Sequence, residues 1–161
     1  MSAEDRRRNE TRRFVEQVGL LFEQNGVPRM AGRIIGWLLV CDPPHQSMAE
    51  LVEALQASKS SISSMSRLLI QLGLVERVSL PGQRRDYFHI AAGVWRSTLR
   101  SGLAQLTAFR ELAERGLKLI EDQSPEQQRR LEEMRELYAF FEREYPVMLA
   151  RWEQESQKGR A

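Results

Sequence analysis

The sequence has almost none of the side chains from which a metal centre or a disulfide is built. Its 161 residues include one cysteine, Cys41, and two histidines, His45 and His89. A single cysteine excludes a disulfide within the chain, and these three residues leave almost nothing for a zinc site. Cys41 is expected to be a small core residue. The alternative is that it senses redox conditions through a dimer.

Long apolar runs are also missing. No window reaches the roughly 18 apolar residues of a membrane-spanning helix, and the polar stretch Met1–Arg13 lacks the apolar segment of a secretory signal. We therefore expect a cytoplasmic protein with no membrane partner. With 29% charged and 42% hydrophobic residues, the composition is that of a globular, helix-rich chain, long enough for one compact domain and a helical extension.

Residue combinations typical of catalysis are absent as well. The sequence has no glycine-rich phosphate loop and no cysteine–histidine or serine–histidine pair in a credible context. His45 follows two prolines in an expected loop, and His89 falls in an expected strand, so both are interpreted as structural or surface residues. We predict that the chain is not an enzyme and needs no metal or cofactor.

Periodic apolar residues predict four helices in the N-terminal half. The first runs from about Glu4 to Gln24, and the second begins at Pro28, ends before Pro43 and is apolar on most sides. Ser47, with Glu50 three residues later, forms a capping box that opens a helix of about two turns.

A short connection then leads to a helix capped by Ser58 and ended by Gly73. Four of its residues are predicted to face inward: Ile62, Met65, Leu69 and Leu72. The stretches Leu74–Leu80 and Asp86–Ala91 are typical of strands, and the Pro81–Arg85 turn between them predicts a β-hairpin.

Two long helices are predicted to follow. The first covers Val94 to about Glu121, and the second starts at Ser124 and Pro125 with a heptad-like seam. Pro146 lies inside that seam, where it is expected to kink the helix near Glu142 or restart it at Tyr145. Glu155–Ala161 is expected to be a loose polar tail.

Helix, tight turn, helix and hairpin is the order of a winged helix-turn-helix, in which the second helix enters the major groove of DNA. The outward face of that helix carries short hydroxyls and cations, which suit close approach to bases and phosphates. Its predicted DNA contacts, with those of the wing, are Ser58, Lys59, Ser60, Ser61, Ser63, Ser64, Arg67, Gln83, Arg84 and Arg85.

The distribution of charge agrees with this interpretation. The whole chain carries only +2, but between Ser58 and Arg85 five cations accompany a single acid, Glu76, for a local charge of +4. The alternative for the serine-rich helix is a polar face without a binding role, which would leave the low helix propensity of serine without compensation. The alternative for Arg84 and Arg85 is a solvated turn.

On these motifs the chain resembles the winged-helix regulators of the MarR class, and more closely the GbsR-like branch. The stretches that carry the resemblance, within roughly Phe14 to Ile90, are Gly26–Arg33, Ala57–Ser63, Leu72–Val75 and Pro81–Phe88. The resemblance implies a homodimer built from the terminal helices, and an effector that binds near the junction of the dimer and DNA-binding regions.

The predicted fold is therefore mainly α, a winged helix-turn-helix with a two-stranded wing and long terminal helices that form a dimerisation region. Its parts are a supporting helix at 1–25, a DNA-binding domain at 26–92 and a dimerisation region at 93–161. The last part has twelve cations and twelve acids from Gly93 onward, a balance that suits packing against another subunit.

The predicted function is a sequence-specific transcriptional regulator that binds a pseudo-palindromic operator on double-stranded DNA, and more narrowly a ligand-responsive repressor. A winged-helix protein-interaction module without DNA binding is the alternative. The candidate dimer contacts, which could instead pack within one subunit, are Phe14, Leu99, Leu106, Leu131, Met134, Tyr138, Phe141, Tyr145, Met148 and Trp152. The candidate pocket for a small-molecule effector, for which core packing is the alternative, consists of Trp37, Trp95, Phe109, Tyr138 and Phe141.

Overall fold

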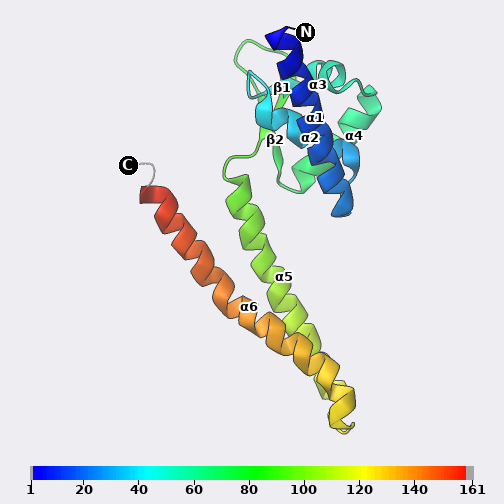
Figure 1. Cartoon of the computed structure of the whole chain (residues 1–161), viewed down its shortest axis with the longest axis vertical. Helices are drawn as coiled ribbons and strands as arrows, with labels where there is room; N and C mark the ends of the chain where they lie inside the picture. The colour runs from blue at the N-terminus through cyan, green and yellow to red at the C-terminus, as the bar shows by residue number, and fades with distance from the viewer. Residues whose placement is uncertain (1, 159–161) are drawn as a thin grey trace. The chain divides into compact units, whose positions relative to one another are not determined.

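The computed structural model describes residues 2–158. Its contacts divide the chain into two units, with the boundary between Val94 and Trp95. The first unit holds seven elements (Figure 1), which are α1 Ala3–Gln24, α2 Arg29–Val40, β1 Gln46–Ser47, α3 Met48–Leu55, α4 Lys59–Gln71, β2 Val75–Ser79 and β3 Asp86–Ile90. The second holds α5, whose first residue Val94 lies at the boundary, and α6: Val94–Leu119 and Pro125–Lys158.

The predicted helix ends are largely confirmed. The Ser47 side chain and Glu50 form the capping box of α3, and the Ser58 hydroxyl accepts a hydrogen bond from the Ser61 amide at 3.2 Å. Gly73 follows α4 with φ of +70°, which a glycine adopts without steric cost. A further capping box at the start of α1, between Ser2 and Asp5, was not predicted.

The predicted hairpin is present and belongs to a larger sheet. Strands β2 and β3 pair antiparallel, with Val75 opposite Ile90 and Ser79 opposite Asp86. The two residues of β1 add a third strand on the other side of β3, so the order is β1-β3-β2. A strand of two residues leaves no alternation to detect in the sequence, and the two-stranded prediction was therefore incomplete.

The core of the first unit lies where α2, α3 and α4 meet. Ile34, Leu51, Ile62 and Leu69 are all fully buried there. The prediction that Leu72 faces inward was wrong: it caps the C-terminus of α4 and is 50% exposed.

Helices α1 and α2 approach each other closely because glycines line their contact. A Cβ built on Gly32 would lie 2.8 Å from the backbone oxygen of Val18 and 2.8 Å from the Cα of Gly19. On the next turn of α2, a Cβ on Gly36 would lie 3.1 Å from the Cα of Val15. The sequence predicts the two helices, but nothing in their hydrophobic periodicity indicates how closely they approach.

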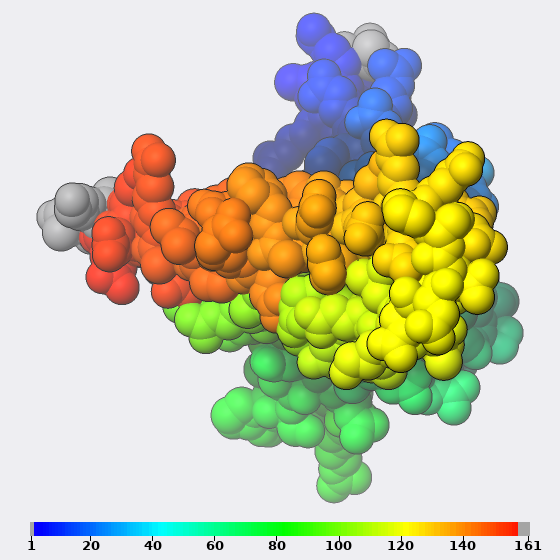
Figure 2. Space-filling view, turned by 90° about the horizontal axis from the view of Figure 1, so that it is seen from below, coloured from blue at the N-terminus to red at the C-terminus, as the bar shows by residue number. Residues whose placement is uncertain are grey.

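The second unit is an antiparallel pair of helices (Figures 1 and 2). Gly102 and Gly116 of α5 face Tyr145 and Leu131 of α6. Ion pairs also join the helices, such as Arg100 to Glu153 at 2.8 Å. No helix within residues 2–158 is long and apolar enough to cross a membrane.

The two expectations for α6 are contradicted only in part. Pro146 lies within a helix that runs unbroken from Pro125 to Lys158, so the helix does not restart at Tyr145, and the alternative of a kink near Glu142 stays a prediction. Of the predicted polar tail, Glu155 to Lys158 are helical, and the remainder lies outside the described residues. The predicted break between the two long helices, after about Glu121 and before Ser124, is confirmed.

Gly32→Ala tests the close contact of α1 with α2. Alanine gains about 1 kcal/mol of helix propensity over glycine, but backbone atoms at 2.8 Å cannot move aside as a side chain can, and overpacking costs about 1 to 3 kcal/mol. We expect a net fall of up to about 2 kcal/mol in the free energy of unfolding, measured by urea denaturation. Gly36→Ala, the matched control on the same face, should lose less; a gain in stability for Gly32→Ala would contradict the contact.

Candidate nucleic-acid interface

Helix α4 presents two polar stripes to its surroundings. Ser60, Ser64, Arg67 and Gln71 recur at intervals of four, three and four, and all four residues are exposed. At 3.6 residues per turn, Lys59 and Ser63 lie on a second stripe about 100° away around the helix axis. The single outward face predicted from the sequence is thus divided, and Gln71 was missed because it follows the serine run.

The remaining predicted serines have local structural roles. Ser58 caps the helix, and its hydroxyl lies 3.1 Å from that of Ser60. Ser61 is half-buried and donates its amide to the cap. These contacts fix the start of the helix, where free N–H groups favour an anion such as a phosphate.

The wing is the connection between β2 and β3. Gln83, Arg84 and Arg85 are exposed there, and the Gln83 amide donates to the Leu80 carbonyl at 3.0 Å to close the turn. At the base of the wing, Arg77 of β2 lies 3.4 Å from the carboxylate of Asp86 of β3. Gly82 has φ of +76°, a conformation that lets the turn reverse tightly.

The two arginines of the wing differ in their surroundings. The positive charge of Arg85 contributes to lowering the pKa of Glu50, after the larger effects of the hydrogen bonds with Ser47. Within residues 2–158, Arg84 carries no ion pair and extends into solvent from the turn. Arg84 is therefore the cation of the wing that is most available to a phosphate.

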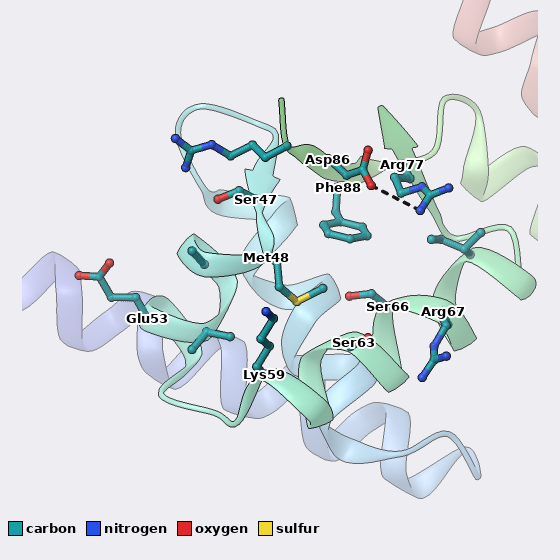
Figure 3. A pocket seen from close by; sticks show the side chains of 14 residues that line it. Ser47, Met48, Glu53, Lys59, Ser63, Ser66, Arg67, Arg77, Asp86 and Phe88 are labelled. Carbon is teal, nitrogen blue, oxygen red and sulfur yellow. Dashed lines mark ion pairs between the residues drawn. The ribbon is translucent and has the colours of Figure 1, made fainter. Parts of the chain in front are cut away.

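Helix α4 and the wing share one cavity, shown in Figure 3. Its volume is 660 Å3. Of the predicted DNA contacts, Lys59, Ser63 and Arg67 of α4 and Arg85 of the wing line it. Arg77, which was not predicted as a site residue, lines it as well. The other predicted residues, Ser58, Ser60, Ser61, Ser64, Gln83 and Arg84, do not line it.

Part of the cavity lining is apolar and was not predicted. It consists of Met48 and Val52 from α3, Ile70 from α4 and Phe88 from β3. Ser66 also lines it; this residue is 1% exposed, and its hydroxyl has no hydrogen-bond partner within the described part of the chain. Nothing in the sequence around Ser66 distinguishes this buried serine from the other serines of the helix.

The predicted dimer residues fall into two groups. Leu106, Leu131, Met134, Tyr138 and Tyr145 are half-buried, and among them Tyr138 stacks on Phe109 of α5 at 4.8 Å between ring centroids. Five others are at least 38% exposed: Phe14, Leu99, Phe141, Met148 and Trp152. Leu137 and Phe140 are exposed on α6 as well and were missed.

The predicted effector residues fall in both units, and within the second unit two of them line a common hollow. Trp37 belongs to the first unit and donates its indole N–H to Gln46 at 3.1 Å. Phe109 and Tyr138 line a hollow of 310 Å3 between α5 and α6, whereas Trp95 and Phe141 do not line it.

Cys41 packs half-buried against the core, and burial raises the pKa of its thiol. A raised pKa lowers the thiolate fraction at neutral pH, which favours the structural role. Within residues 2–158, no cluster of three or more His, Cys, Asp or Glu side chains could hold a metal ion.

Comparison with known proteins agrees with this geometry. A family model described as MarR family matches residues 25–86, and one described as MmpR5-like MarR family transcriptional regulator matches residues 93–155. The chain is 43% identical over 141 residues to the HTH-type transcriptional regulator MmpR5 of Mycobacterium tuberculosis, covering 88% of this chain and 86% of that protein. The chain belongs to the MarR family of transcriptional regulators.

A solved structure of a transcriptional regulator gives the same result for the fold. It is 41% identical to this chain, covers 90% of it and 99% of its own length, and superposes with a TM-score of 0.74. This MarR-family protein is thus a DNA-binding transcriptional regulator with a winged-helix fold. The GbsR-like branch predicted from the sequence is not confirmed, since the C-terminal match is MmpR5-like.

Proposed function

We propose that this regulator binds a pseudo-palindromic operator as a homodimer and represses transcription by occupying it. The observation that carries the proposal is the convergence of Lys59 and Arg67 of α4 with Arg85 of the wing on one cavity. A helix and a hairpin that expose cations on the same side suit a duplex, because one can enter a groove while the other follows the backbone.

The exposed stripe of α4 and the wing have different roles in binding DNA. Ser60, Ser64 and Arg67 lie on the exposed stripe, where short hydroxyls allow close approach and an arginine can make two hydrogen bonds to a guanine. Arg84, without an ion pair among the described residues, contacts the phosphate backbone. Sequence is read by the helix, and the wing adds affinity for any duplex.

The C-terminal unit supports the homodimer. Leu137, Phe140, Phe141 and Met148 of α6 are each more than 40% exposed, and Figure 2 shows α6 open along much of its length. Exposed apolar patches of this kind mark interfaces. A two-fold axis would repeat α4 about 34 Å away, one turn of DNA, and this spacing gives the operator its symmetry.

The remaining parts of the proposal rest on family resemblance. We infer that the protein acts in the cytoplasm, has no enzymatic activity and responds to a small molecule. Its assignment to the GbsR-like branch remains a prediction from the N-terminal motifs.

Arg84→Ala tests the backbone contact. We expect weaker binding to every duplex, because a lost phosphate contact lowers the salt dependence of log K by about 0.9 per contact. The slope should therefore fall by about two for a dimer with two altered wings. Fluorescence anisotropy over a salt series, with a duplex enriched from a random-sequence library, provides the measurement.

The control is Arg151→Ala on α6, where the guanidinium pairs with Glu155 at 3.0 Å. It removes the same charge and should leave both affinity and slope unchanged. If Arg84→Ala behaves like this control, the wing does not contact the backbone.

Phe141→Glu tests the homodimer. A carboxylate on the exposed apolar face of α6 should raise the dissociation constant of the dimer at least tenfold, because an unpaired charge would be buried at the interface. Sedimentation velocity measures the dissociation constant, and Gln154→Glu, on an exposed position of the same helix, adds the same charge as a control. A Phe141→Glu protein that stays dimeric at nanomolar concentration would argue against this interface.

A further inference from the structure

The turn between α3 and α4 is held by an arginine of α2. The guanidinium of Arg33 donates a hydrogen bond to the Leu55 carbonyl at 2.9 Å. Leu55 is the last residue of α3, and Gln56, in the left-handed region with φ of +48°, turns the chain toward α4. Arg33 thus binds the chain four residues before Lys59, the first residue of α4.

The Leu55 carbonyl depends on this donor. The amides of the turn serve two other carbonyls of α3, because Gln56 donates to Glu53 at 3.3 Å and Ala57 donates to Val52 at 3.2 Å. No backbone amide within residues 2–158 donates to Leu55. The last carbonyls of a helix have no partner inside the helix and carry the negative end of its dipole, so a guanidinium suits this position.

Helix α1 holds Arg33 in place from the other side. The Nε atom of Arg33 is shielded from solvent and lies 2.7 Å from Oε1 of Glu16, in an ion pair without the angle of a hydrogen bond. The second oxygen of Glu16 pairs with Arg29 at 2.9 Å. Gly19 leaves room for the arginine stem, since a Cβ there would lie 2.8 Å from the Cγ of Arg33. The side chain of Arg33 is therefore fixed between α1 and the end of α3.

We propose that Arg33 is a positioning residue for DNA recognition, which fixes the turn between α3 and α4 against α1 and so sets the angle at which α4 enters the groove. The inference rests on the proposed function, in which α4 reads the sequence. Hydrogen bonds to base edges require that α4 be held closely in place, whereas contacts with phosphates carry no sequence information. Loss of the Arg33 contact therefore lowers specificity more than affinity for DNA in general.

The test compares Arg33→Met with Arg29→Met. Each variant removes a cation that pairs with Glu16 and keeps an unbranched side chain of high helix propensity. The difference is that Arg33 also binds α3, whereas the hydrogen bond of Arg29 within residues 2–158 goes to Glu16. Arg29→Met is thus the matched control for the contact with Leu55.

The measured quantity is the specificity ratio, the dissociation constant for a duplex with scrambled half-sites divided by that for the enriched duplex. We expect Arg33→Met to lower this ratio about tenfold or more, the effect of about one lost base contact. Arg29→Met should leave the ratio unchanged. A variant that is merely less stable weakens binding to both duplexes by the same factor, so its ratio does not move.

Hydrogen exchange measured by NMR reports on the turn without DNA. The amides of Gln56 and Ala57 should exchange faster in Arg33→Met than in the wild type and in Arg29→Met, because the turn opens more often. If Arg33→Met does not fold, Arg33→Lys takes its place. An ammonium lacks the planar fork that serves Glu16 and Leu55 together, so the ratio should fall by a smaller factor, about threefold.

A wild-type ratio in folded Arg33→Met overturns the proposal, as does a wild-type ratio in Arg33→Lys where the methionine variant does not fold. An equal fall in Arg29→Met also overturns it, because the charge beside Glu16 would then be the cause. A wild-type protein that does not distinguish the two duplexes instead refutes the reading of sequence by α4. Exchange of the Gln56 and Ala57 amides then decides by itself whether Arg33 holds the turn.

Discussion

The orientation of α4 depends on two buried side chains. Ile62 and Leu69 are seven residues apart, both fully buried, and they lie on the face of the helix that packs against α2 and α3. Two anchors two turns apart fix the rotation of a helix about its own axis. Once that rotation is set, Ser60, Ser64 and Arg67 must face outward, and Ser63 and Ser66 must face the wing. Recognition of DNA thus depends on apolar packing at residues that never contact it.

The same rotation explains why the exposed polar surface of α4 borders a cavity. Arg67 is exposed and also lines the cavity, because it lies at the edge of the exposed stripe that is nearest to Ser63. The wing supplies the opposite wall, and the pair Arg77–Asp86 lies at its base. The geometry that makes a groove for the DNA backbone thereby also leaves an apolar space beneath it.

The sequence predicts the elements better than it predicts their contacts. Helix starts with Ser47 and Ser58 as caps, and the glycine after α4, follow from local hydrogen bonding and φ preference, which are properties of a few adjacent residues. Strand β1 was missed because two residues carry no periodicity. Leu72 was placed in the core because the apolar pattern continues to the residue at which the helix stops. Ser66 was assigned to neither face, because only the rotation set by Ile62 and Leu69 decides which serine is buried.

Whether α4 reads sequence is tested most directly by comparing Arg67→Ala with the wild type on two duplexes. One is enriched from a random library, and the other has both half-sites scrambled. The account predicts a loss of about 1 to 3 kcal/mol per contact on the enriched duplex and a much smaller loss on the scrambled one, so that specificity falls. An equal loss on both duplexes would make Arg67 a phosphate contact and would contradict the assignment of base reading to this face of α4.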